Sequence, residues 1–153
     1  MRAAGRSRFV YVIYIRSTPQ KVWKALTDSK FIRQYWFGMD IQSAWKKGSP
    51  WKMTLPDGMP TDTGKILEIE PPKRMVIHWQ HEWQKDIKAE GPGRCTIELK
   101  KVQASVRVTI THEINRPKSK LIEAVAGGWP LILSNLKSLL ENGKIAVKDH
   151  PRH

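Results

Sequence analysis

The sequence contains a single cysteine, Cys95, among its 153 residues. One cysteine excludes an internal disulfide and a zinc site built on several cysteines. Cys95 lies where apolar residues alternate with polar ones, so we expect a buried apolar side chain rather than a reactive thiol. This cysteine usage fits the reducing environment of the cytoplasm.

Long hydrophobic stretches are missing as well. No stretch approaches the roughly 18 consecutive apolar residues that a membrane-spanning helix needs. Residues 1–8 are basic and have neither the apolar centre nor the cleavage site of a secretory signal. We therefore expect no membrane span and a cytoplasmic location.

Acidic residues are scarce: 14 aspartates and glutamates stand against 27 lysines and arginines, which gives a formal net charge of +13. Such an excess is typical of proteins that bind nucleic acid, an anionic membrane surface or an acidic protein. Here the basic residues are scattered over turns and solvent-facing positions, so a soluble basic surface is the simpler interpretation. No helix-turn-helix pattern or stacked aromatic platform is visible, so we expect no sequence-specific nucleic-acid partner.

Recognisable catalytic motifs are absent too. We find no glycine-rich phosphate loop, nucleophile elbow, zinc-hydrolase motif or Ser-His-Asp order. Several carboxylates fall near turns or on solvent-facing phases of predicted strands, where they balance the basic surface: Asp40, Asp57, Asp62, Glu68, Glu70 and Glu82. From the sequence we therefore assign no catalytic residue, no metal ligand and no cofactor.

The apolar pattern predicts a strand, two short helices and then a series of strands. Residues 9–15 are β-branched and aromatic, as in a strand. Thr18 and Pro19 are suited to begin a helix, and a second short helix is expected over 30–36. From residue 41 to residue 112 the period changes to two between turn signals, which predicts about six strands. The polar stretch 84–93 is expected to be a loop.

The C-terminal part is predicted to be one long helix, because apolar residues recur there at three- and four-residue spacing from 121 to 140. Pro130 follows two glycines and a tryptophan, so we expect a kink or a break in the helix there. Gly143 is suited to end the helix. No repeat or linker divides the chain. We therefore predict one α+β domain over 1–153, with an ordered core at about 8–143 and tails at 1–7 and 144–153.

Five stretches of the chain, in order and at compatible spacing, carry a family resemblance. They read PQKVWKALTD (19–28), YWFG (35–38), GKILEIEPPKRMVIHW (64–79), TITHE (109–113) and GWPLILSNLKSLLENG (128–143). With these stretches the chain resembles the Aha-type branch, the activators of a heat-shock chaperone ATPase, of the START-like helix-grip superfamily. This superfamily, also called SRPBCC, includes the Bet v-like proteins. The chain resembles its small bacterial single-domain members.

The resemblance implies a helix-grip fold: a curved antiparallel sheet of about six to seven strands wrapped around the C-terminal helix, with two short helices after the first strand. Members of the superfamily hold apolar ligands such as lipids, sterols and polyketides in the gap between helix and sheet. Some members are cyclases or aromatases, and the eukaryotic activators bind a chaperone. Binding of a hydrophobic or aromatic small molecule is therefore the function that the resemblance favours.

Tryptophan is abundant, with seven residues in the chain, and its broad apolar ring suits both core packing and recognition of flat ligands. We expect Trp36, Trp79 and Trp129 to be walls of the pocket. The remaining candidate ligand-binding residues are Met53, His81, His112, Tyr35 and Arg33. His81 and His112 fall on inward-facing phases of their strands, whereas His78 falls on an outward-facing phase. Core packing, a hydrogen-bonded core histidine or a plain helix surface would also explain each of these residues.

Two other functions stay open at this point. One is a partner-binding module for a chaperone or another acidic macromolecule, based on the surface charge. The other is a cyclase or hydrolase that uses the cavity, for which His81 and His112 would be the only candidate catalytic groups. We expect binding rather than catalysis, and a homodimer remains possible.

Overall fold

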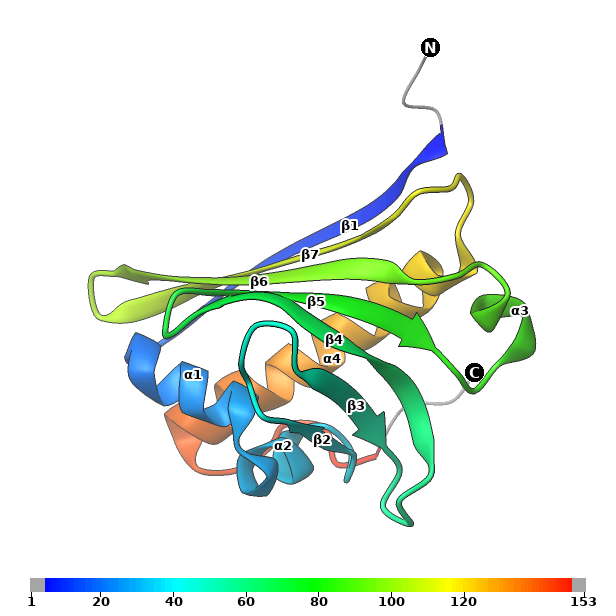
Figure 1. Cartoon of the computed structure of the whole chain (residues 1–153). Coiled ribbons are helices and arrows are strands. Elements are labelled where there is room, and N and C mark those ends of the chain that lie inside the picture. The colour runs from blue at the N-terminus through cyan, green and yellow to red at the C-terminus, as the bar shows by residue number, and fades with distance from the viewer. Residues whose placement is uncertain (1–4, 150–153) are drawn as a thin grey trace.

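A seven-stranded antiparallel sheet curves around the long C-terminal helix α4, as Figure 1 shows. The computed structural model describes residues 5–149, so parts of the expected tails, residues 1–4 and 150–153, lie outside the described residues. The elements in chain order are β1 (Ser7–Ile15), α1 (Pro19–Thr27), α2 (Ser29–Tyr35), β2 (Asp40–Ser43), β3 (Pro50–Thr54), β4 (Pro60–Glu70), β5 (Arg74–His81), α3 (Lys85–Lys88), β6 (Gly93–Val102), β7 (Ser105–Ile114) and α4 (Lys120–Asn142).

The strand order is β1-β7-β6-β5-β4-β3-β2, and every neighbouring pair is antiparallel. The predicted α+β fold, with its curved sheet, its two short helices after β1 and its long terminal helix, is confirmed. One face of the sheet is wet and the other packs on the helix, which is why β7 alternates strictly between half-buried and buried residues. Cys95 on β6 is fully buried, as expected.

Local capping separates the two short helices. The Thr18 side chain accepts a hydrogen bond from Lys21 N at 3.2 Å and begins α1, with Pro19 in the first turn. The Asp28 side chain accepts one from Lys30 N at 2.8 Å and begins α2. Together these caps place Trp36, directly after α2, over the interior of the sheet, where it is 7% exposed.

Two expectations about helices were wrong. The stretch 84–93 is not all loop, because α3 forms one short helical turn within it. The expected break at Pro130 does not occur, because α4 continues as one helix of 23 residues with the proline inside; the kink expected there stays a prediction. The apolar face of α4 on both sides of the proline, including Trp129, Ile132 and Leu133, is buried against the sheet. This packing outweighs the one backbone hydrogen bond that a proline removes.

A β-bulge in β4 changes which residues of this strand face inward. Ile66 pairs with Ile77 of β5 while Glu68 pairs with the adjacent Val76, so one extra residue, Leu67, stands in β4. Side chains alternate strictly along a strand, and an inserted residue reverses that alternation. Counting back from Glu68 in steps of two predicts that Asp62 and Gly64 face solvent. Because of the bulge, they face the interior instead.

Gly64, also in β4, lies between two tryptophans on neighbouring strands. It pairs with Trp51 of β3 on one side and with Trp79 of β5 on the other. Because glycine has no side chain, the two indole rings approach to 4.5 Å between centroids. A Cβ atom at this position would lie 1.6 Å from the carbonyl oxygen of His78, so no other residue fits this backbone.

Glu90, in the loop before β6, fixes the beginning of α4. Its carboxylate accepts hydrogen bonds from Ser119 Oγ at 2.6 Å, Lys120 N at 2.7 Å and Leu121 N at 3.2 Å. Burial opposes ionisation of Glu90, but these hydrogen bonds together outweigh it and lower the pKa of the carboxyl group. The Ser119 hydroxyl also accepts a bond from Ile122 N at 3.1 Å. Glu90 thus satisfies amide groups that a helix start leaves free.

Asn135, fully buried on α4, holds the segment that follows the helix. Its Oδ1 accepts hydrogen bonds from Ala146 N at 3.0 Å and Val147 N at 2.7 Å, and its Nδ2 donates to Val147 O at 2.8 Å. Nδ2 also lies 3.3 Å from Tyr35 O, at the end of α2. Residues 144–147, which belong to the expected C-terminal tail, are therefore attached to the core.

The Glu90 cap generates a first prediction. Replacing Glu90 with alanine leaves amides at the start of α4 without their acceptor, so we expect the free energy of unfolding to fall by about 1–2 kcal/mol. The measurement is urea denaturation followed by tryptophan fluorescence. Glu123→Ala is the matched control, because Glu123 is an exposed acid in the same first turn. An equal loss in both variants would contradict the capping role.

Candidate functional site

A cavity of about 170 Å³ lies between α4 and the strands β3, β4 and β5. Its lining residues are Trp36, Met53, Asp62, Trp79, His81, Leu121, Ala124, Val125, Gly128, Trp129 and Ile132. Ligand pockets for drug-sized molecules usually measure roughly 300–1,000 Å³. The cavity is therefore nearer to the size of a single aromatic ring, since an apolar cavity of about 150 Å³ binds benzene.

Aromatic side chains fill most of the remaining space between helix and sheet. The ring of Trp129 lies edge-on to Trp36 at 5.3 Å and to Trp79 at 6.0 Å between centroids. Trp79 also contacts the His112 ring at 4.9 Å. Aromatic pairs at such separations stabilise the core by about 0.5–1.5 kcal/mol each beyond their buried area. The three predicted pocket walls thus form one connected cluster at the cavity.

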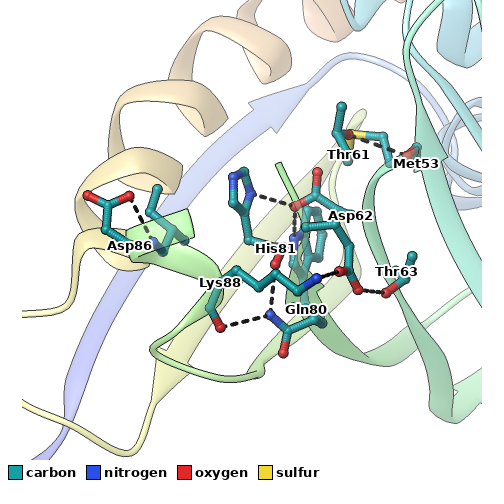
Figure 2. Close-up of polar contacts among 11 residues, drawn as sticks. Met53, Thr61, Asp62, Thr63, Gln80, His81, Asp86 and Lys88 are labelled. Atoms are coloured by element: carbon teal, nitrogen blue, oxygen red, sulfur yellow. Dashed lines mark hydrogen bonds and ion pairs between the residues drawn. The ribbon is translucent and has the colours of Figure 1, made fainter. Parts of the chain in front are cut away.

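Asp62 is the buried carboxylate of the cavity wall, with 8% of its surface exposed. Its Oδ2 accepts a hydrogen bond from Trp79 Nε1 at 2.8 Å and lies 3.2 Å from His81 Nδ1. Figure 2 shows the His81 ring turned toward this carboxylate. Asp62 and His81 are also direct partners in the β4–β5 register, so both side chains leave the sheet side by side.

The Asp62 contact determines which nitrogen of His81 carries the proton. A carboxylate oxygen accepts, so Nδ1 is the nitrogen that donates and, in the neutral ring, Nε2 keeps a lone pair. Nε2 is buried and has no hydrogen-bond partner among the described residues. His81, which is among the residues that line the cavity, therefore has an oriented imidazole with an unsatisfied acceptor.

His112 on β7 lies behind the tryptophans and is not among the residues that line the cavity. It is fully buried, and its Nδ1 accepts a hydrogen bond from Trp129 Nε1 at 3.2 Å. Burial lowers the pKa of His112 to about 4, although the charge of Asp62 acts in the opposite direction. The ring is therefore neutral at pH 7 and helps to hold Trp129 in place.

The structure separates the eight candidate ligand-binding residues into two sets. Five line the cavity: Trp36, Met53, Trp79, His81 and Trp129. Three do not: His112, Tyr35 and Arg33. Tyr35 is fully buried and its hydroxyl donates to Ala25 O at 2.8 Å, and burial raises the pKa of this hydroxyl. Arg33 is half exposed and pairs with Asp40 at 3.5 Å.

The expectation that Asp62 faces solvent was wrong, and the bulge in β4 is the reason. Counting outward from Glu68 and Glu70, which face solvent, places Asp62 on the same phase. The extra residue Leu67 reverses the phase, so that Asp62 faces the interior. The inward-facing His81 on the adjacent strand was the one available signal, because a buried histidine needs a polar partner.

The small residues of α4 on the cavity wall, Ala124 and Gly128, were also not predicted. They leave the cavity open along the N-terminal half of the helix, where Ala124 is exposed. Within residues 5–149, no group of three or more potential metal ligands occurs, and no helix is both long and apolar enough to cross a membrane.

Comparison with known proteins gives a family match over most of the chain. The family described as Activator of Hsp90 ATPase homolog 1-like protein matches residues 16–141. No curated protein matches the sequence.

Several solved structures are similar. The solution structure of the Aha1 dimer from Colwellia psychrerythraea is 25% identical, covers 90% of this chain and 98% of its own, and superposes with a TM-score of 0.71. An HSP90 activator from Plasmodium falciparum is 20% identical over 87% of this chain and 95% of its own, with a TM-score of 0.70. CalU16 from Micromonospora echinospora is 18% identical over 94% of this chain and 82% of its own, with a TM-score of 0.72. The last two show the fold alone.

The buried His112 generates a second prediction, on pH and stability. Its pKa is about 4 in the folded protein, against an ordinary value of 6.5, so the unfolded chain binds more protons as pH falls. The contribution of His112 to the free energy of unfolding is therefore fully present above about pH 6.5. It falls by about 3 kcal/mol as the pH is lowered to about 4.

Urea denaturation at pH 7 and pH 4 tests this effect in the native protein and in His112→Gln, whose side-chain oxygen still accepts from Trp129. From pH 7 to pH 4 the native protein should lose about 3 kcal/mol more of its free energy of unfolding than His112→Gln loses. The titration of surface carboxylates cancels in this difference. His78→Gln is the control, since His78 lies on the outer face. A constant difference at both pH values would contradict the role of His112.

Proposed function

The chain belongs to the family of Activator of Hsp90 ATPase homolog 1-like proteins, and from this premise we propose that it binds a hydrophobic or aromatic small molecule in the cavity between its sheet and α4. The observation that carries the proposal is an open cavity of about 170 Å³ bounded by three indole rings. Burial of an apolar surface there stabilises a complex by about 25 cal/mol per Å².

The geometry of α4 supports a cavity that admits ligands. Gly128 faces the cavity, yet a Cβ atom at this position would meet only Ile132 Cδ1, at 3.9 Å. Alanine would therefore fit and would favour the helix by about 1 kcal/mol. A glycine at this position gives up helix stability and keeps the wall of the cavity open.

Gly128 and Gly127 provide a matched pair for the third prediction. Gly128→Leu places a branched side chain in the cavity and should weaken binding of p-xylene at least tenfold. Gly127→Leu makes the same chemical change on the exposed side of the helix, where a Cβ atom would meet nothing within 4 Å. The measurement is an NMR titration that follows the indole N–H signals. Equal affinity in both variants, or no binding to the native protein, would contradict the proposal.

A basic groove on the outer face of the sheet favours a second candidate function, docking of an acidic partner. The groove lies over the β6–β7 hairpin and is lined by Lys73, Lys100, Lys101 and Arg107, together with Glu70 and Glu98. Lys100 and Arg107 are directly opposite in the register, a like-charge arrangement that costs stability. No ion pair among residues 5–149 involves Lys100, Lys101 or Arg107.

The family to which the chain belongs is described as Activator of Hsp90 ATPase homolog 1-like protein, which supports a chaperone as one such partner. The relative from Colwellia psychrerythraea is a dimer, which supports the homodimer that the sequence leaves open. For the third possibility, an enzyme that uses the cavity, His81 is the candidate group that lines the cavity, because His112 is covered by Trp129.

The basic groove generates a fourth prediction. Arg107→Thr removes the like-charge pair, so we expect a gain in stability of about 0.5 kcal/mol and a weaker, less salt-dependent binding of polyglutamate. Lys52→Thr is the control, because it removes one charge from β3 at a position paired with Gln42 and Thr63. Binding is measured by fluorescence anisotropy at about 50 and about 200 mM salt, a range over which screening of surface charges changes strongly. An equal effect of both variants would indicate net charge alone and would contradict a docking site.

A further inference from the structure

Among the residues that line the cavity, His81 has a buried side-chain atom, Nε2, that lacks a hydrogen bond. This nitrogen has no hydrogen-bond partner among the described residues, while the other ring nitrogen contacts Asp62. A buried polar atom without a partner costs about 1–3 kcal/mol. Only 14% of the His81 side chain is exposed, so bulk water gives little compensation. A ligand that supplies the missing hydrogen bond would recover this cost.

Asp62 decides what kind of group can supply it. In the neutral ring, in which Nδ1 donates to Asp62, Nε2 presents a lone pair and requires a donor from the ligand. An anionic ligand would meet both this lone pair and the negative charge of Asp62, whose Oδ2 is 3.2 Å from the ring. The site therefore selects a neutral O–H donor over a carboxylate or phosphate.

The imidazole is oriented by the contact of its Nδ1 with Asp62, and hydrogen bonds hold the backbone around it. Figure 2 shows further polar contacts around the ends of β4 and β5. Glu82 N donates to Thr61 O at 2.8 Å, directly beyond the Asp62–His81 pair. Gln80 Nε2 donates to His81 O at 2.7 Å and lies 3.3 Å from Lys88 O, which connects β5 to the end of α3. An anchor that is ordered before binding loses little entropy when the ligand arrives.

We propose that the Asp62–His81 pair is the polar anchor of the cavity, and that the ligand is a flat apolar molecule whose hydroxyl group donates a hydrogen bond to His81 Nε2, as a phenol does. The proposal rests on the function proposed above. Trp36, Trp79 and Trp129 bind the ring of the ligand, and His81 fixes its direction in the cavity. Flat hydrocarbons of the same shape bind less tightly, because they leave Nε2 unpaired.

Two probes of nearly equal shape test the anchor: p-cresol carries a hydroxyl group where p-xylene carries a methyl group. Dissociation constants come from NMR titrations of the native protein, His81→Leu and the control His78→Leu on the outer face. The readout is the ratio of the p-xylene constant to the p-cresol constant. We expect this ratio to be at least about tenfold higher in the native protein and in His78→Leu than in His81→Leu.

The outcomes separate the anchor from the cavity. If both probes bind and Gly128→Leu weakens both, but the ratio is the same in all three proteins, the anchor is overturned while the proposed function stands. If neither probe binds, both proposals fail. Should His81→Leu not fold, the ¹⁵N signal of His81 Nε2 in the native protein decides: p-cresol must shift it and p-xylene must not. A shift of equal size with both probes would also overturn the anchor.

Discussion

The packing of Trp129 against the sheet is the interaction on which the rest of the structure depends. This one side chain contacts Trp36, which follows α2, and Trp79, which lies on β5. Its indole N–H also reaches His112 on β7. The long helix, the short helices and the centre of the sheet are therefore joined at one residue. The side chain also forms part of the wall of the small cavity.

The polar atoms in this interior are arranged around the indole donors. Trp129 donates to His112, and Trp79 donates to Asp62, which in turn contacts His81. A tryptophan supplies one N–H on a broad apolar ring, so it can satisfy a buried acceptor without adding a second polar atom that needs a partner. Nε2 of His81 and Nε2 of His112 have no hydrogen-bond partner among the described residues. Of these two histidines, His81 is the one that lines the cavity.

The sequence predicts the parts of this design that depend on regular periods. Alternation along β7 placed Val106, Val108 and Ile110 inside, and the recurrence of apolar residues placed α4 on the sheet. Prediction fails where the period is broken or overruled. The inserted Leu67 reverses the phase of β4 and brings Asp62 inside. Tertiary packing carries α4 through Pro130. Tyr35 is packed in the core, where its hydroxyl donates to Ala25 O, and it does not line the cavity. Its position depends on how α2 packs against the rest of the protein, which the sequence period does not specify.

The bulge at Leu67 has a consequence for how such proteins diversify. Glu68 and Glu70 lie on one side of it and face water, whereas Asp62 lies on the other side and faces the interior. Loss of one residue at the bulge would exchange the two faces along half of the strand and leave the strand order as it is. A single-codon deletion or insertion is thus a larger step in binding chemistry than most substitutions. Relatives with the same fold but a different residue count in this strand would carry a different lining in their cavities.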